Sequence, residues 1–425
     1  MKCIKVNKKN YNLHVINVDT FRSCNFQLSF KCPFDSKKSI AYAMLSDILT
    51  DQSVNYPTSK YITRHMQESY ILNFFGSFSR TGKSICTNIN CEYIDPKYID
   101  EKNYLDETYK FIFDVISNPL IINNGFEEKN FNIVKNRYIK ELKELEGNNK
   151  FLSINNALKY FTKDEIISFH PHDMLSFVEN ITSKDLYDYY LDMIQNTSID
   201  IFITGSTPKE KIEKLIEKYY PFKNNEYQKY NDLVYAKNKI IPKKVFCKSH
   251  YKQSCLVMIY NVNYLSTYER EFVMPFYLNI LNGSGLTSKL YQNLREKNSL
   301  CYNVNTTYHD RCNYMTVVST INVGKENKAI RLVKKSVNAM KNNISDKEFI
   351  NAYYGYQSSL KGSLDSLSAI LRIYLNKYYA DFSSYEEKLN TFKKVKLREV
   401  YELSKKIRLN TIYVLKGDIN ERNQD

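Results

Sequence analysis

The secondary-structure elements predicted for this 425-residue chain follow one order twice. Each half shows alternating strands, a helix, a loop, a second helix, more strands, several helices and a closing apolar strand. The string Ile-Leu, followed shortly by Thr-Ser-Lys, occurs at 48–60 and again at 280–289. A repeated order of elements indicates duplicated domains. We therefore predict an N-terminal domain at 1–220, a linker at 221–243 and a C-terminal domain at 244–425.

Hydrophobic periodicity places the individual elements. Residues 11–18 and 25–32 alternate as strands, and a helix that Ser36 can cap follows them. The other helices predicted for the first half cover 59–69, 104–116, 131–145, 151–161, 183–194 and 208–220, and the other strands 71–78, 84–92 and 199–204. In the second half, strands are predicted within 244–262, a helix at 267–281, and a last strand at 411–415.

A glycine loop opens the second helix of the C-terminal half. Gly283, Ser284 and Gly285 predict a tight turn, and leucines follow it at helical spacing. Two glycines before a helix also suggest a dinucleotide-binding fingerprint, but that motif needs a buried strand directly before it. Residues 272–281 predict a helix instead, which argues against a nucleotide site.

The helix after this loop carries Arg295, and Tyr302 lies where the next strand is predicted to begin. We expect both side chains to reach one cleft. Taken singly, an Arg near a helix C-terminus favours the helix dipole, and a strand Tyr is ordinary packing. The ordered run Ser-Lys-Leu, Leu-Arg-Glu-Lys and Leu-Cys-Tyr within 288–302 is more specific than either residue, and it favours a functional interpretation.

The composition indicates a folded protein, because 43% of its residues are hydrophobic, and a length of 425 residues indicates more than one domain. The net charge of +15 comes from lysines spread among Asn and Tyr, which we ascribe mainly to biased composition. An acidic partner or substrate is the alternative, and we expect no nucleic acid. The nine cysteines are scattered along the chain, and we predict that they are reduced thiols. The lack of a long apolar run predicts that the chain has no membrane segment. Together with the polar N-terminus, these features predict a cytoplasmic location.

The run at 282–304 and the duplicated plan resemble the pitrilysin/insulinase family of zinc peptidases. The resemblance implies an α+β fold of two duplicated domains, each a mostly antiparallel sheet packed on helices, forming half of a clamshell. It also implies a His-x-x-Glu-His signature on the first helix, where two histidines bind zinc and the Glu activates water. In this family two such chains often close around an unfolded peptide.

The signature is missing from this chain. Its slot falls on Ala43, Ser46 and Asp47, which lack both histidines and the Glu. No two histidines stand four residues apart anywhere in the sequence. Glu141 lies near the position of the family's third ligand, but without histidines we interpret it as a solvated carboxylate. We therefore predict a degenerate zinc slot in the N-terminal domain and no bound metal or other cofactor.

Two further catalytic interpretations are weak. The segment His170-Pro171-His172 could hold a metal loosely, but structural zinc sites offer four ligands at recognisable spacing. No Gly-x-Ser-x-Gly elbow is present, which argues against a self-sufficient hydrolase.

The resemblance implies a non-catalytic, substrate-binding subunit of a heterodimeric zinc peptidase. Its partner would be a homologous subunit bearing His-x-x-Glu-His and the zinc. Arg295 would hold carbonyl oxygens of a peptide substrate, and Tyr302 would donate to the oxyanion of the tetrahedral intermediate. Gly283, Ser284 and Gly285 would let the peptide pass close to the backbone. A peptide-binding or scaffold protein without a catalytic partner is the alternative.

Overall fold

A computed structural model describes residues 2–223, 226–230, 232–283 and 287–418. The chain forms two compact units. The first contains residues 1–143, 171–232 and 366–371, and the second contains 144–170, 233–365 and 372–425.

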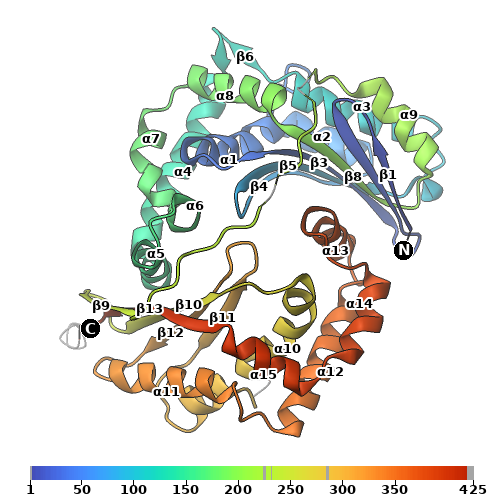
Figure 1. Ribbon diagram of the computed structural model, residues 1–425. Helices are drawn as coiled ribbons and strands as arrows, with labels where there is room; N and C mark the ends of the chain where they lie inside the picture. Colours follow the sequence, from blue (N-terminus) through green and yellow to red (C-terminus); the bar gives the residue numbers. More distant parts are fainter. Residues whose placement is uncertain (1, 224–225, 231, 284–286, 419–425) are drawn as a thin grey trace. The chain divides into compact units, whose positions relative to one another are not determined.

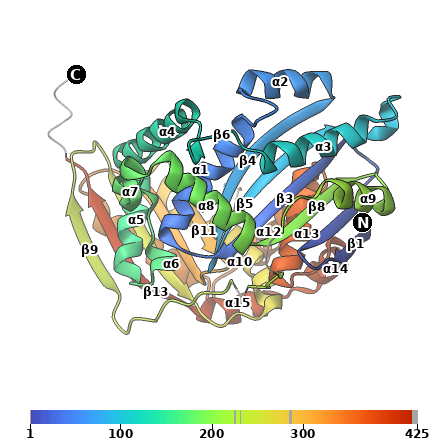
Figure 2. The same ribbon diagram turned by 90° about the horizontal axis from the view of Figure 1, so that it is seen from above.

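The first unit is built on a six-stranded sheet in the order β1-β2-β8-β3-β5-β4 (Figures 1 and 2). β2 and β8 are parallel, and the other neighbouring pairs are antiparallel. The strands are β1 (Lys2–Asn7), β2 (Tyr11–Asn17), β3 (Ser23–Pro33), β4 (Ile71–Thr81), β5 (Ser84–Ile94) and β8 (Ser198–Gly205). A separate two-stranded ribbon is formed by β6 (Ile121–Ile122) and β7 (Gly125–Phe126).

Helices cover one face of this sheet (Figures 1 and 2). α1 begins after Asp35, whose carboxylate accepts from Lys38 N at 2.8 Å, so Asp35 rather than the predicted Ser36 is the cap. α3 packs on β3 through edge-to-face rings, with Phe26 5.6 Å from Tyr109 and 5.8 Å from Phe113. The helices up to residue 219 are α1 (Ser36–Asp51), α2 (Ser59–Glu68), α3 (Tyr104–Ser117), α4 (Glu128–Gly147), α5 (Asn149–Phe161), α6 (Glu165–Ser168), α7 (Leu175–Asn180), α8 (Ser183–Asn196) and α9 (Lys209–Tyr219), with short 3₁₀ turns at Pro96–Tyr98 and Pro171–Met174.

The second unit repeats the sheet of the first in strand order and direction. Its order is β9-β13-β10-β12-β11, and again only the β9–β13 pair is parallel. β9 through β13 therefore correspond in turn to β2, β3, β4, β5 and β8. The strands are β9 (Lys243–Lys248), β10 (Ser254–Val262), β11 (Val304–His309), β12 (Tyr314–Ile321) and β13 (Ile407–Lys416). The α+β fold with two duplicated, mostly antiparallel sheets is thus confirmed.

Both faces of the second sheet are buried at its centre, and β10 shows this most directly. Leu256, Met258 and Tyr260 belong to a core shared with the helices α10, α11, α12 and α15 (Figure 1). Cys255 and Val257 alternate with them and pack in a second core with α5. Side chains alternate across a strand, so the continuous burial of β10 requires a cover on each face.

The helices of the second half belong mostly to this unit, but the start of α13 lies in the first unit. They are α10 (Met274–Asn282), α11 (Glu326–Ala339), α12 (Asp346–Gly362), α13 (Leu367–Ala380), α14 (Tyr385–Thr391) and α15 (Leu397–Lys405), with π-helical segments at Glu269–Val273 (η3) and Tyr291–Glu296 (η4) and a 3₁₀ turn at Phe392–Lys394. Within the described residues, no helix has both the length and the apolar character that a membrane crossing requires.

Candidate functional site

The segment that carries Arg295 is helical, as predicted, but its geometry is that of a π-helix. It covers Tyr291–Glu296, and Lys297 N donates to Gln292 O at 3.0 Å, a bond over five residues. π-Helical turns are rare and occur frequently at functional sites. The widened turn ends the helix at Glu296, one residue after Arg295, and Ser299 then reverses the chain with a positive φ of 47°.

Arg295 and Tyr302 lie in contact. The Arg295 guanidinium carbon is 4.9 Å from the ring centroid of Tyr302 and 4.9 Å from that of Tyr291. Tyr302 precedes β11, which begins at Val304, so the prediction that Tyr302 lies on a strand was wrong. The turn after the π-helix, rather than a strand, holds its ring against Arg295. Each cation–π contact contributes about 0.5–1 kcal/mol at an exposed site.

The polar groups of this pair are available to a ligand. The side chain of Arg295 is 39% exposed, and its Nε lies 3.9 Å from Glu296 Oε1. Tyr302 is 81% exposed. Neither the guanidinium nor the Tyr302 hydroxyl forms a hydrogen bond with any residue that the structure describes. An exposed Arg and an exposed phenol held side by side can donate together to oxygen atoms of a bound molecule.

One residue of the glycine loop can be described. Gly283 ends α10 and donates from its N to Asn279 O at 2.8 Å. A Cβ at this position would come within 2.6 Å of the same oxygen, so a larger residue would force the loop to move. Ser284 and Gly285, which were also predicted to bind substrate, lie outside the described residues.

Two polar contacts hold the Arg295 helix in place, and the sequence did not reveal them as part of the site. Lys289 Nζ lies 2.7 Å from Glu348 Oε1, and Asn293 Nδ2 donates to Ser336 Oγ at 2.8 Å. Glu348 also closes the capping box of α12 with Ser345. That Ser-x-x-Glu pattern is readable in the sequence, but its pairing with Lys289 is not.

The degenerate zinc slot lies on α1. Ala43 is buried, and Ser46 Oγ donates to Ala43 O at 2.7 Å. Asp47 Oδ2 is 2.7 Å from Arg137 Nη2 on α4. Burial, together with Asp47, raises the pKa of the neighbouring Tyr138. The only carboxylate of the slot is therefore engaged with a cation and a phenol.

These side chains do not fit a zinc ion. Zinc sites use at least three Cys, His, Asp or Glu ligands, whereas the slot offers one carboxylate that is already paired. Glu141, near the expected third ligand, is exposed on α4. Across the part of the chain that the structure describes, no three His, Cys, Asp or Glu side chains are grouped so as to hold a metal.

The segment His170-Pro171-His172 does not gather ligands either. His170 is buried and its Nε2 hydrogen-bonds Asn155 Nδ2, while His172 Nδ1 lies 3.1 Å from Leu142 O. Each imidazole therefore forms its own local contact, and the two do not act together as ligands.

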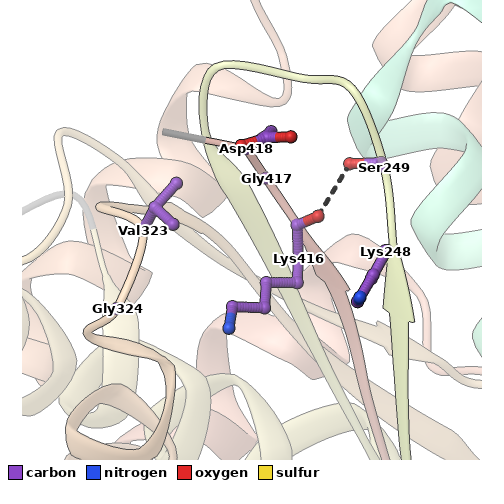
Figure 3. Close-up of a pocket in the computed structure, with 7 residues that line it drawn as sticks. All are labelled: Lys248, Ser249, Val323, Gly324, Lys416, Gly417 and Asp418. Carbon is purple, nitrogen blue, oxygen red and sulfur yellow. Dashed lines mark hydrogen bonds between the residues drawn. The ribbon is translucent and has the colours of Figure 1, made fainter. Parts of the chain in front are cut away.

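Figure 3 shows a pocket of about 360 Å³ elsewhere in the second unit. It lies where β9 and β13 end, beside the loop that holds Val323 and Gly324. Ser249 Oγ donates to Lys416 O across it at 3.0 Å, and Lys248, Lys416 and Asp418 are all among its lining residues. None of the site residues predicted from the sequence lines this pocket.

Comparison with known proteins identifies the family. Residues 180–352 match the family model described as the peptidase M16 inactive domain. A curated relative, the probable inactive metalloprotease YmfF of Bacillus subtilis (strain 168), is 20% identical over 408 residues, 95% of each protein. This chain is similar to M16 peptidases, including proteins that are described as inactive. The resemblance to the pitrilysin/insulinase family is confirmed.

Solved structures agree with the M16 assignment at the level of the fold. A conserved protein from Enterococcus faecalis V583 has a TM-score of 0.91 and 22% identity, covering 98% of this chain and 99% of that chain. A peptidase M16 inactive domain from Pseudomonas fluorescens has a TM-score of 0.76 and 12% identity, covering 99% and 98%. The M16 fold therefore extends over the whole chain.

Proposed function

We propose that this chain is the non-catalytic, substrate-binding subunit of a two-chain zinc peptidase. The zinc and the water-activating Glu would come from a homologous chain with His-x-x-Glu-His. Arg295 and Tyr302 would come from this chain. The observation that carries the proposal is the stacked pair itself, two exposed donors without hydrogen-bond partners among the described residues.

The chemistry of the pair suits peptide hydrolysis. Attack of water on a peptide carbonyl develops negative charge on its oxygen, and a Tyr hydroxyl can donate to that oxyanion. A guanidinium can hold neighbouring carbonyl oxygens and so keep the peptide in register. Stacking on Tyr291 and Tyr302 restricts where the guanidinium can lie, which reduces the ordering cost of binding.

The degenerate zinc slot supports the proposal that the zinc and the Arg–Tyr pair come from different chains. Asp47 is paired with Arg137, and Ala43 and Ser46 offer no zinc ligand, so zinc would have to come from another chain. The description of the matching family model as inactive agrees with this division. A peptide-binding scaffold would show the same slot, so the two functions differ in what Arg295 and Tyr302 do.

The test is kinetic and uses the protein co-purified with a homologue that carries His-x-x-Glu-His. Tyr302→Phe removes only the hydroxyl, and we expect kcat/KM for peptide cleavage to fall roughly 100-fold or more, the usual cost of one oxyanion donor. Arg295→Ala should also raise KM, because it removes a contact to the bound peptide. Zinc content and assembly of the pair should not change.

Tyr264→Phe is a matched control, since Tyr264 is 79% exposed in the same unit and also stacks on another Tyr ring. We expect the control to retain full activity. Melting temperatures of all variants exclude a folding defect. If Tyr302→Phe and Arg295→Ala cleave peptides at the wild-type rate, the pair has no catalytic role and the scaffold function is favoured.

A further inference from the structure

A second pocket of the second unit, about 530 Å³ in volume, lies between the C-terminal turns of α11 and α15 and the start of β13. We call it the basic pocket. Its polar lining is dominated by Lys334 and Lys341 from the α11 side and by Lys405 and Arg408 from the α15–β13 side. No Asp or Glu is among its lining residues. The volume is in the range of small-molecule sites, roughly 300–1,000 Å³.

Ordinary helix capping accounts for part of this charge. Cations favour helix C-termini, and α11 and α15 both end at the pocket. Each C-terminus is equivalent to roughly half a negative charge, so the two ends offset about one of the four cations. Glu402 offsets one more, because its Oε1 lies 2.7 Å from Lys405 Nζ. About two positive charges remain unbalanced.

The remaining cations have no protein partner within the described residues. Lys334, Lys341 and Arg408 form no ion pair or side-chain hydrogen bond there. The pocket of Figure 3, by contrast, has the acidic residue Asp418 in its lining as well as two lysines. The basic pocket is therefore the stronger candidate for an anionic ligand.

One lining residue of the basic pocket, Tyr260, belongs to the buried core of the unit. Tyr260 is 2% exposed and lines the pocket, and its hydroxyl has no hydrogen-bond partner in the described structure. Most buried hydroxyls find a partner, because burial removes them from water. The apolar residues Val337 and Ile407 line the pocket beside it.

We propose that the basic pocket binds a small polyanion that carries two or more phosphate groups. Lys334 and Lys341 would hold one group, and Lys405 and Arg408 would hold another. Arg can bind a phosphate through two parallel hydrogen bonds, and Lys binds it as a point charge. This site is independent of Arg295 and Tyr302, neither of which lines it.

The test is calorimetric titration of the full-length protein with sodium tripolyphosphate at 150 mM salt. We expect one site per chain with a dissociation constant on the order of 10 µM. Citrate provides a carboxylate polyanion with about one negative charge fewer near pH 7 and should bind at least about tenfold more weakly. Equal affinity for citrate would overturn the assignment to phosphate.

Two double variants distinguish binding in the basic pocket from non-specific attraction of an anion to a basic protein. Lys334→Gln with Lys341→Gln removes two cations from the pocket, and we expect affinity to fall at least about tenfold. Arg331→Gln with Lys335→Gln removes two exposed cations from the same helix but outside the pocket. This control should change affinity less than about twofold, since salt screens distant exposed charges.

Two outcomes would overturn the site itself. One is the absence of binding at millimolar tripolyphosphate. The other is an equal loss of affinity in the pocket and control variants, which would show non-specific attraction. Circular dichroism and melting curves establish that both double variants are folded.

Discussion

Asp47 occupies one of the two ligand places that the family resemblance assigns to α1. The contacts of Asp47 and its neighbours show how the slot is filled in this protein. Its carboxylate pairs with Arg137 at 2.7 Å, and that contact joins α1 to α4. Ser46 bonds within its own helix, and a Cβ on Gly76 of β4 would overlap Ser46 O, so the backbones of β4 and α1 touch at this point. The slot is closely packed, and a protein contact takes the place of a metal.

We expect the purified chain to contain no stoichiometric zinc. The physical reason is that a paired Asp beside Ala43 and Ser46 cannot complete the three or four ligands that zinc needs. Elemental analysis of the metal content checks this. Asp47→Ala should leave the background unchanged, and one tightly held zinc per chain that is lost in this variant would contradict the interpretation of the slot.

At the scale of elements, the helix that carries Arg295 depends on α12. Lys289 Nζ bonds Glu348, which also accepts from Ser345 N at 2.8 Å. Burial would raise the pKa of Glu348, but the hydrogen bonds from Lys289 and Ser345 hold it below its ordinary value of 4.5. The ionised carboxylate therefore stabilises both the α12 cap and the entry to the π-helix.

We expect Glu348→Gln to lower the free energy of unfolding by about 1–2 kcal/mol at pH 7. Because the folded-state pKa is depressed, this contribution is present above pH 4.5 and is lost as the pH falls through the folded pKa. The difference between wild type and variant should thus shrink in acid. Thermal unfolding from pH 7 to pH 3.5 measures it.

Glu402→Gln is the matched control for this prediction. Its pair with Lys405 has the same 2.7 Å separation, but both side chains are more than half exposed. Exposed pairs contribute little, so the control should leave the stability nearly unchanged. Equal effects in the two variants would show that the Lys289–Glu348 contact has no special role.

α5 is the second element whose placement matters. It lies within the predicted N-terminal domain, at 149–161, yet it packs on β10 and β13 in the second unit. Ala157, which is completely buried, belongs to the same core as Val257 and Tyr413. Without α5, this face of the second sheet would expose its apolar side chains.

Replacing Ala157 by Glu should destabilise the second unit by about 3 kcal/mol or more, because an unpaired carboxylate would be buried on the sheet. Hydrogen exchange should show earlier opening of β10 and β13. Lys159→Glu, at an exposed position of the same helix, is the control. Unchanged protection of β10 in the Ala157 variant would mean that α5 does not stabilise that sheet.

At the scale of the whole molecule, the fold of the M16 neighbours covers the full chain, but the described residues offer no group of ligands for a zinc ion. A complete active site would need a second chain, as proposed above. The basic charge of +15 would favour association with a more acidic homologue, because complementary charge accelerates encounter.

We expect a 1:1 heterodimer when this chain is mixed with a homologue bearing His-x-x-Glu-His. The surface buried should be at least that of a specific interface, about 1,200–2,000 Å² in total, which is large enough for stable association. Sedimentation velocity of the mixture and of each chain alone measures assembly. Separate species at micromolar concentrations would favour the scaffold function.

Much of the fold followed from local pattern. α3, predicted at 104–116, covers Tyr104–Ser117, and β8, predicted at 199–204, covers Ser198–Gly205. Both have strong periodicity or continuous apolar character, and these depend only on neighbouring residues. The loss of the zinc ligands was equally readable, since a missing histidine needs no structure to be seen. The duplication was visible because the order of elements survives when side chains change.

The sequence by itself determined which segments form helices and strands, that the plan is repeated, and that Arg295 and Tyr302 are candidates for one site. Only the tertiary structure decided which sheet α5 covers, that the Arg295 guanidinium stacks between Tyr291 and Tyr302, and that Lys289 reaches Glu348. The physical reason is that periodicity shows that a face is buried but not against what. Partners distant in sequence are selected by packing and charge in the folded chain, and these leave no local signal.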